Sequence, residues 1–273
     1  GASGDLIPLA HLSLPLIEEG TVLYKGEILP SRTALKKAGL KPIELVEKEG
    51  LGLINGTQIM LAVGSLALVK ALHLQEMADL VAALSFEGSV GNLSALNPLI
   101  HNVRRQSGQI QSAKNIFKYL KGSYLNNPKT FPARIQDPYS LRCAPQVHGA
   151  SRDALTYVTS IVEAELNAVT DNPLVFVEED LILSGGNFHG QPLAMAYDFA
   201  AIAVAEFANI SERRLELLLN PHMSGLAGFL ATNEGVDSGY MCLQYLSASL
   251  VNENKILSHP ASTDSIPGNV GVE

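Results

Sequence analysis

Apolar residues recur at helical spacing along much of the chain. Between residues 148 and 169, five of them lie three or four positions apart, which predicts a helix that ends before the Asn172-Pro173 pair. These residues are Leu155, Val158, Val162, Leu166 and Val169. Residues 192–219 contain no proline or glycine after Pro192 and predict a rod about 40 Å long at 1.5 Å per residue. A further helix is predicted over residues 238–257.

The longest apolar stretch covers residues 59–72 and predicts a buried helix that begins at Thr57 or a close neighbour. It is interrupted by Gly64, Ser65 and Lys70, so it is too short and too polar for a membrane span. A helix that is apolar all round must be covered by neighbouring elements. We therefore expect a core helix and no membrane insertion.

Two short hairpins and one short helix complete this pattern. Residues 22–29 hold two apolar runs around a Lys-Gly turn, and residues 174–183 form a similar pair around an acidic turn. Ser31 is expected to cap a helix that runs through Lys37 and stops at Gly39. Long helices with few strands predict an all-α fold, a bundle of long rods.

Residues 122–149 interrupt the helical pattern with four X-Pro pairs. A loop of this length inside a compact domain is typical of a functional segment. Gln136, Tyr139 and Arg142 are spaced three apart, which predicts one helical turn that presents all three to one side. The alternative is a well-packed surface loop with an ordinary Arg-Asp pair.

Composition narrows the class of protein. A chain of 273 residues with 47% hydrophobic content can bury a substantial core. Cys143 and Cys242 are too few for a disulfide framework or a zinc site, which favours the reducing cytoplasm. The net charge of -8 argues against a nucleic-acid partner. The seven histidines show no ligand spacing, and we assign no metal, including at His148 and His189.

The tripeptide Ala2-Ser3-Gly4 can become an electrophile through its own backbone. Attack of the Gly4 nitrogen on the Ala2 carbonyl, followed by loss of two waters, gives 4-methylideneimidazol-5-one (MIO). Glycine leaves that nitrogen unhindered and permits a strained bend, while Ser3 supplies a leaving hydroxyl. The alternative is a turn of small residues before a helix.

This tripeptide and further blocks along the chain resemble the MIO-dependent aromatic amino acid ammonia-lyases, and among them those that act on histidine. The blocks are Gly1 to Leu9, Leu53 to Gln58, Gly108-Gln109, Gln136 to Cys143, Asp171 to Pro173, Ser184 to Pro192, and Asp264 to Pro267. The resemblance implies an all-α bundle like the aspartase/fumarase superfamily. It also implies that residues 1–273 are the central helical part of one domain, with N-terminal and C-terminal regions of the family absent.

The resemblance implies a role for each residue near the electrophile. Ala2, Ser3 and Gly4 match the MIO precursors, so no external cofactor is expected. Asn55 matches an asparagine that hydrogen-bonds the MIO carbonyl and stabilises negative charge there. Tyr139 matches a tyrosine implicated in MIO formation and in catalysis.

Other matching positions concern the substrate. Arg142 matches the arginine that holds the substrate carboxylate, a task that suits a bidentate guanidinium. Gln136 and Asn172 match polar residues around the carboxylate and the MIO, and Phe188 matches an aromatic residue of the pocket. Glu273 matches a glutamate near the substrate imidazole, whose N–H can satisfy a carboxylate that a phenyl ring would leave unpaired.

The implied reaction is elimination of ammonia from L-histidine to give urocanate, carried out by a cytoplasmic homotetramer whose active sites draw residues from three subunits. Residues 268–272 depart from the pattern usual in histidine enzymes. A tyrosine or phenylalanine ammonia-lyase, or an aminomutase with the same MIO, therefore stays open. The third alternative is an inactive helical scaffold.

Overall fold

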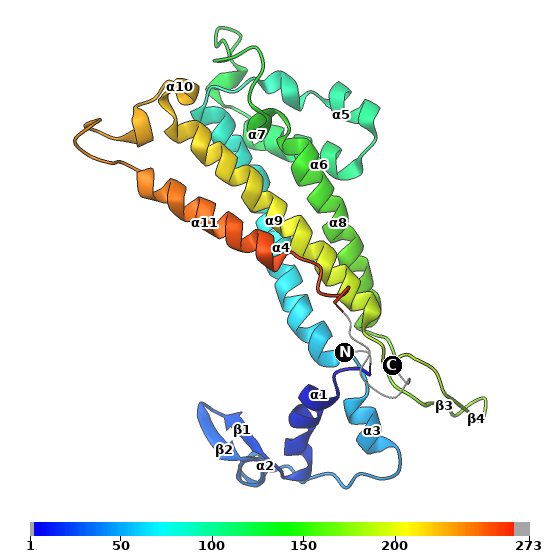
Figure 1. The fold of residues 1–273 in the computed structure, drawn as a ribbon. Helices are drawn as coiled ribbons and strands as arrows, with labels where there is room; N and C mark the ends of the chain where they lie inside the picture. The colour runs from blue at the N-terminus through cyan, green and yellow to red at the C-terminus, as the bar shows by residue number, and fades with distance from the viewer. Residues whose placement is uncertain (1–2, 265–273) are drawn as a thin grey trace. The chain divides into compact units, whose positions relative to one another are not determined.

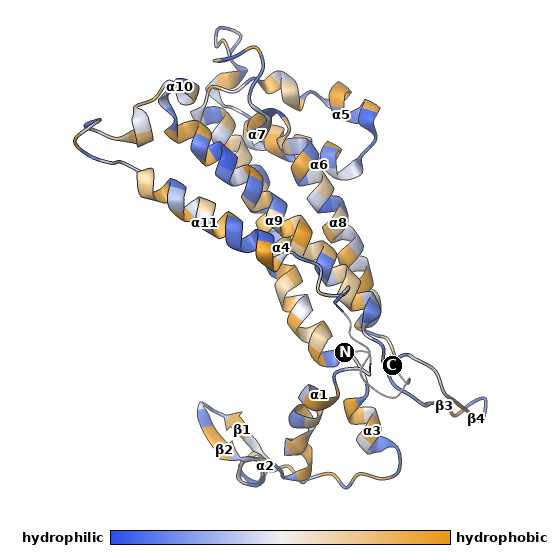
Figure 2. Cartoon of the chain, viewed as in Figure 1, coloured by the Kyte–Doolittle hydropathy of each residue, from blue (hydrophilic) through white to orange (hydrophobic). Residues whose placement is uncertain are grey.

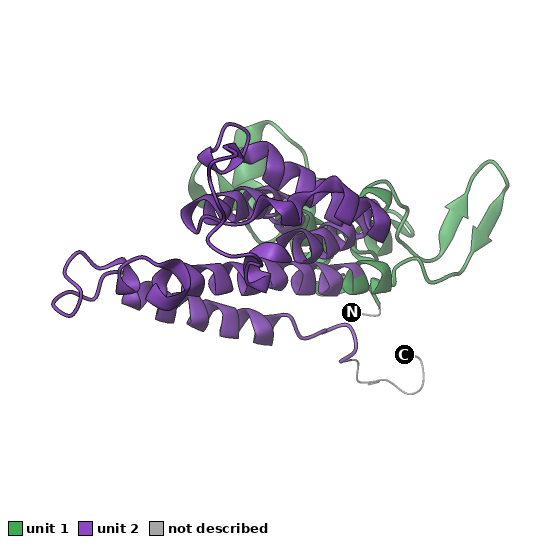
Figure 3. Ribbon diagram, turned by 90° about the horizontal axis from the view of Figure 1, so that it is seen from above, with its two compact units in different colours: residues 1–66, 161–195, 265–273 green, residues 67–160, 196–264 purple. Residues whose placement is uncertain are grey.

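The computed structural model describes residues 3–264, which divide into two compact units (Figure 3). Unit 1 comprises residues 1–66, 161–195 and 265–273, and unit 2 comprises residues 67–160 and 196–264. Three long helices contribute residues to both units. They are α4 (Gln58–Gly88), α8 (Ala144–Glu165) and α9 (Gln191–Leu219).

Unit 1 opens with a series of short elements (Figure 1). They are α1 (Leu6–Ser13), the 3-10 turn η1 (Leu14–Ile17), β1 (Thr21–Tyr24), β2 (Glu27–Pro30), α2 (Ser31–Ala38) and α3 (Glu49–Ile54). Strands β1 and β2 pair antiparallel around Lys25 and Gly26, which both have positive φ. The first predicted hairpin is thus confirmed.

Helix α2 also ends as predicted, at Gly39 with φ 70°. The predicted cap at its start was wrong, because Ser31 is the first helical residue and Pro30 holds the cap position. The buried Ser31 hydroxyl has no hydrogen-bond partner among the described residues. A serine that stands one residue after the cap position directs its hydroxyl away from the free N–H groups of the first helical turn.

The second hairpin is confirmed in unit 1, where β3 (Leu174–Phe176) pairs antiparallel with β4 (Leu181–Leu183). The helix predicted over residues 148–169 is shifted toward the N-terminus, since α8 ends at Glu165. Leu155 and Val158 are fully buried, whereas Leu166 and Val169 lie beyond the helix and are exposed. These two residues keep the helical spacing of apolar positions although they lie in the turn after α8, so the predicted helix extended too far.

Unit 2 packs long helices around an apolar core. Its shorter elements are η2 (Leu93–Leu96), α5 (Pro98–Arg104), α6 (Ser107–Tyr119), η3 (Tyr124–Asn126), α7 (Tyr139–Arg142), α10 (Pro221–Ser224) and η4 (Gly228–Leu230), and it ends with α11 (Met241–Leu257). The core joins Phe86 of α4, Ile116 of α6 and Leu141 of α7, all fully buried. Leu141 therefore fixes the short helix α7 to the core.

The predicted apolar helix is present as α4 but is longer and less covered than expected. It continues to Gly88 because residues 73–87 contain no proline or glycine that would end it. Val63 and Leu66 are 66% and 70% exposed, so the prediction of burial all round was wrong for the described chain. Figure 2 shows colours toward the hydrophobic end of the scale along much of α4.

Two helical stretches, Glu49–Gly88 and Gln191–Leu219, are long and apolar enough to cross a membrane by length and composition. Core helices of other proteins pass the same test. The expectation that the chain does not insert into a membrane stays a prediction.

Candidate functional site

The backbone at Gly4 makes a tight turn against a second glycine. Gly4 has φ +85°, and a Cβ placed there would lie 2.8 Å from the carbonyl oxygen of Gly56 and 3.2 Å from that of Phe188. The next residue, Asp5, donates its N–H to the same Gly56 oxygen at 2.7 Å. Both the positive φ and the close approach require glycine at this position.

Asp5 ties this turn to the start of α4. Its carboxylate oxygen Oδ2 accepts the backbone N–H of Met60 at 2.9 Å, in the first turn of the helix. A carboxylate at a helix N-terminus satisfies an unpaired N–H and faces the positive end of the helix dipole. The segment that carries Ser3 and Gly4 is thereby held at one end of a long rigid helix.

Asn55 and Asn172 are brought together beside this turn. Asn55 is 8% exposed, and its Nδ2 donates to the carbonyl oxygen of Asn172 at 3.2 Å and to Oδ1 of Asp171 at 3.4 Å. The side chain of Asn172 accepts the N–H of Gly185 at 2.7 Å. The peptide bond between Asn172 and Pro173 is cis. Both predicted asparagines therefore belong to one hydrogen-bonded group in unit 1.

Asp171 organises that group, a role that sequence reasoning missed. Its Oδ1 also accepts the N–H of Asn172 at 2.7 Å, and its Oδ2 forms an ion pair with Lys48. Lys48 precedes α3 and lies 123 positions away from Asp171. The Asp-Asn-Pro pattern in the sequence indicates a turn, and nothing in it indicates a distant lysine.

Phe188 lies in the loop between β4 and α9. Its side chain is half-buried, and its backbone carbonyl faces Gly4. The next residue, His189, accepts the N–H of Gln191 on Nδ1 at 3.1 Å, which satisfies one donor at the start of α9. Backbone groups of this loop therefore contribute to the geometry of the site as much as side chains do.

In unit 2, α7 brings Tyr139 and Arg142 together. The Arg142 guanidinium carbon lies 5.0 Å from the centroid of the Tyr139 ring, within cation–π range. The Nε of Arg142 donates to the carbonyl oxygen of Asp137 at 3.1 Å. The Tyr139 side chain is 72% exposed in the described chain.

Gln136 does not share this helical turn, so the prediction of three residues on one turn was wrong. Helix α7 begins at Tyr139 with Pro138 as its cap, and Gln136 lies exposed before it. The buried Asp137 intervenes, because its carboxylate accepts the N–H of Asn92 at 2.6 Å. Arg134, and not Arg142, forms the ion pair with Asp137.

The predicted site residues thus fall into two groups, one in each unit. Ser3, Gly4, Asn55, Asn172 and Phe188 belong to unit 1. Gln136, Tyr139 and Arg142 belong to unit 2. Ala2 and Glu273 lie outside the described residues. Among residues 3–264, His, Cys, Asp and Glu side chains form no group of three or more that could hold a metal ion.

The residues around Gly4 fit the precursor of an internal electrophile. Cyclisation brings the Gly4 nitrogen back toward the carbonyl two residues earlier, which a left-handed glycine allows. The Asn55 amide adds a donor next to the Gly56 backbone, where a developing negative charge would be stabilised. The role of each residue stays a prediction.

Comparison with known proteins gives a consistent relationship over the whole chain. The family profile described as aromatic amino acid lyase matches residues 1–273. The histidine ammonia-lyase of Alkaliphilus oremlandii (strain OhILAs) is 50% identical over 273 residues, which are 100% of this chain and 54% of that protein. The chain therefore spans about half the length of the curated relatives it matches.

Solved structures agree in fold. The crystal structure of histidine ammonia-lyase from Trypanosoma cruzi matches with a TM-score of 0.89 and 43% identity, over 100% of this chain and 52% of that one. The tyrosine aminomutase from Streptomyces globisporus matches with a TM-score of 0.87 and 38% identity, over 98% and 55%. The predicted all-α fold of the aspartase/fumarase-like class is confirmed.

Proposed function

Because the chain belongs to the aromatic amino acid lyase family, we propose that it is part of an enzyme that eliminates ammonia from L-histidine to give urocanate. The observation that carries the proposal is the Gly4 turn, packed against Gly56 in a chain that is 50% identical to a histidine ammonia-lyase. The turn supports the formation of the electrophile, and the relatives support the substrate class.

The chemistry needs an electrophile, because a free amino group is a poor leaving group and the β-proton is only weakly acidic. An MIO formed from Ala2, Ser3 and Gly4 would supply an electron-poor carbon that captures the substrate amine. Asn55 is proposed to stabilise negative charge on the MIO carbonyl oxygen by turning one Nδ2 N–H from the Asn172 carbonyl toward it, while the Asp171 carboxylate holds the other N–H.

Arg142 binds the substrate carboxylate in this proposal. A planar guanidinium can donate two parallel hydrogen bonds to a carboxylate, and stacking on Tyr139 limits its rotation. The Tyr139 hydroxyl is placed on the same short helix and can hold or move a proton near the bound amine. Glu273 is proposed to accept a hydrogen bond from the imidazole ring.

We also propose a cytoplasmic homotetramer that shares its active sites between subunits. Support comes from large apolar side chains that the described chain leaves exposed, such as Val63 and Leu66 on α4 and Leu250 on α11. Such surfaces are typical of subunit interfaces. Two cysteines are too few for a disulfide framework, which supports a reducing compartment.

A second candidate function is an aminomutase that returns the amine to the β-carbon of tyrosine. It is favoured by the 38% identity to a tyrosine aminomutase. The higher identity to histidine ammonia-lyases ranks it second.

The test is turnover by the purified full-length protein with L-histidine, L-tyrosine and L-phenylalanine in separate reactions. We expect urocanate and one ammonia per histidine consumed. Coumarate or cinnamate in place of urocanate would overturn the histidine assignment, and a β-amino acid product would favour the aminomutase. A Glu273→Gln variant serves as the substrate control, since it should impair turnover of histidine more than that of phenylalanine.

A further inference from the structure

A charged cluster is fully buried in unit 2, away from the side chains assigned to the reaction. Asp79 of α4, His148 of α8 and Arg214 of α9 are each at most 1% exposed. Oδ1 of Asp79 lies 2.8 Å from Nδ1 of His148, and Oδ2 accepts hydrogen bonds from Asn115 at 2.9 Å and Arg152 at 2.8 Å. Buried charges are costly, so each member of such a cluster needs a structural or functional reason.

The hydrogen-bond directions follow from the state of His148. Burial lowers the pKa of His148 below its usual value, so the ring is neutral at neutral pH. Its Nδ1–H then donates to Asp79, which leaves Nε2 as an acceptor. Nη1 of Arg214 lies 3.5 Å from that Nε2 and donates to the carbonyl oxygen of Ser140 at 3.3 Å.

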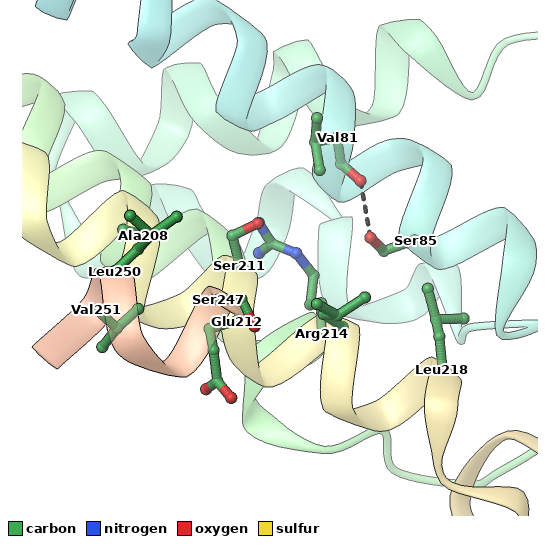
Figure 4. Close-up of a pocket in the computed structure, with 11 residues that line it drawn as sticks. Val81, Ser85, Ala208, Ser211, Glu212, Arg214, Leu218, Ser247, Leu250 and Val251 are labelled. Atoms are coloured by element: carbon green, nitrogen blue, oxygen red, sulfur yellow. Dashed lines mark hydrogen bonds between the residues drawn. The ribbon is translucent and has the colours of Figure 1, made fainter. Parts of the chain in front are cut away.

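Arg214 has no carboxylate partner of its own among the residues that the structure describes. The neighbouring Glu212 pairs with Arg213 and points away from Arg214 in Figure 4. Nε and Nη2 of Arg214 have no hydrogen-bond partner within residues 3–264, and Arg214 lines a cavity of about 350 Å³ between α4, α9 and α11. Burial lowers the pKa of Arg214 to about 10, which keeps the guanidinium charged at neutral pH.

The contact with Ser140 matters because of where Ser140 lies. It is the second residue of α7, directly after Tyr139 and two residues before Arg142. A helix of four residues leaves carbonyl groups without an intrahelical partner, so outside donors hold it together with the buried Leu141. Arg214 is such a donor, and its Nη1 also approaches Nε2 of His148, whose ring is held by Asp79.

We propose that Arg214 is a positioning residue, which holds the Ser140 carbonyl and thereby fixes α7 so that Arg142 and Tyr139 keep their working orientation. This inference rests on the proposed function, in which Arg142 binds the substrate carboxylate. Arg214 does not touch the substrate and acts through α7.

The experiment is a double-mutant cycle on the full-length protein with Arg214→Met and Arg142→Lys, measured as KM and kcat for L-histidine. Arg142→Lys removes the bidentate fork, and Arg214→Met removes the donor to Ser140. We expect each single variant to raise KM at least tenfold, and the double variant to lie within threefold of Arg142→Lys alone. Residues that act through one another give such non-additive effects.

Arg104→Met is the control for loss of an arginine side chain, because Arg104 lies exposed on α5 and forms no ion pair within residues 3–264. It should leave KM and kcat unchanged. Arg214→Lys provides a milder second variant, since lysine keeps the positive charge but replaces the planar guanidinium with a compact ammonium group on a different side chain. We expect it to raise KM three- to tenfold with an unchanged melting temperature.

Unchanged KM and kcat in Arg214→Lys, or KM effects of Arg214→Met and Arg142→Lys that multiply in the double variant, would overturn the positioning role. If Arg214→Met fails to fold, the cycle is run with Arg214→Lys, and the double variant is then expected to have the same KM as Arg142→Lys alone. A wild-type protein that converts tyrosine or phenylalanine instead overturns the histidine assignment alone, and the cycle is then run with that substrate. A wild-type protein that converts none of the three amino acids overturns both proposals.

Discussion

Replacement of Gly4 by alanine tests whether the turn that carries Ser3 and Gly4 is as constrained as its geometry indicates. A Cβ on Gly4 would lie 2.8 Å from the oxygen and 3.0 Å from the nitrogen of Gly56. These are backbone atoms, so neither can rotate away as a flexible side chain would. The φ of +85° adds a conformational cost for any residue with a Cβ.

The magnitude follows from two terms. A left-handed conformation costs an alanine about 1–2 kcal/mol. Forcing an extra carbon against packed backbone costs about 1–3 kcal/mol more. We therefore expect Gly4→Ala to lower the free energy of unfolding by about 2–5 kcal/mol, the sum of the two ranges.

Gly26→Ala separates the two terms. Gly26 has φ +89°, but a Cβ placed on it would have no neighbouring atom within 4 Å among the described residues, so this variant carries only the conformational cost. Both variants gain equally from the reduced entropy of the unfolded chain, and that contribution cancels in their difference. Urea unfolding of the two full-length variants at equal protein concentration measures the remaining steric cost. Equal stability of the two variants would refute the close approach at Gly4.

Three other positions offer further tests. Ser3→Ala should abolish turnover without unfolding the protein, because it removes the leaving hydroxyl and little volume; retained turnover would refute the role of Ser3. Asp171→Ala should cost about 1–3 kcal/mol of unfolding free energy, because it leaves partly buried donors unpaired, whereas the exposed Glu179→Ala should cost almost nothing; equal effects would show that Asp171 does not organise its neighbours. Burial depresses the pKa of His148 in the folded state, so the contribution of His148 to stability is present above the unfolded value of 6.5 and is lost as pH falls through the folded pKa. His148→Gln should therefore flatten the dependence of the urea midpoint on pH below 6.5. An unchanged slope would contradict this expectation.

Local patterns in the sequence were sufficient for most of the fold. The Lys-Gly turn at Gly26 and the glycine stop at Gly39 depend on residues close in sequence, and both are confirmed. Periodicity placed α9 to within one residue because no proline or glycine interrupts it after its first turn. Helix ends were less well predicted, as at Leu166, because apolar residues in a turn imitate the helical period.

Contacts between distant segments could not be predicted. The ion pair of Lys48 with Asp171 joins residues 123 positions apart, and Arg214 reaches the Ser140 carbonyl across 74 positions. The sequence shows Arg213 and Arg214 as an ordinary charged pair, yet the first is largely exposed and the second fully buried. Packing of α9 against α7 and α8 distinguishes them, and that packing is a property of the folded chain.

The intact mass of the purified full-length protein is the most direct test of the account, because every proposed role depends on an electrophile made from Ala2, Ser3 and Gly4. We predict that the wild-type mass is lower than the mass calculated from its sequence by two waters. A matched peptide digest should place that loss on the segment that contains Ser3. A protein that produces urocanate while this segment retains both waters would contradict the account.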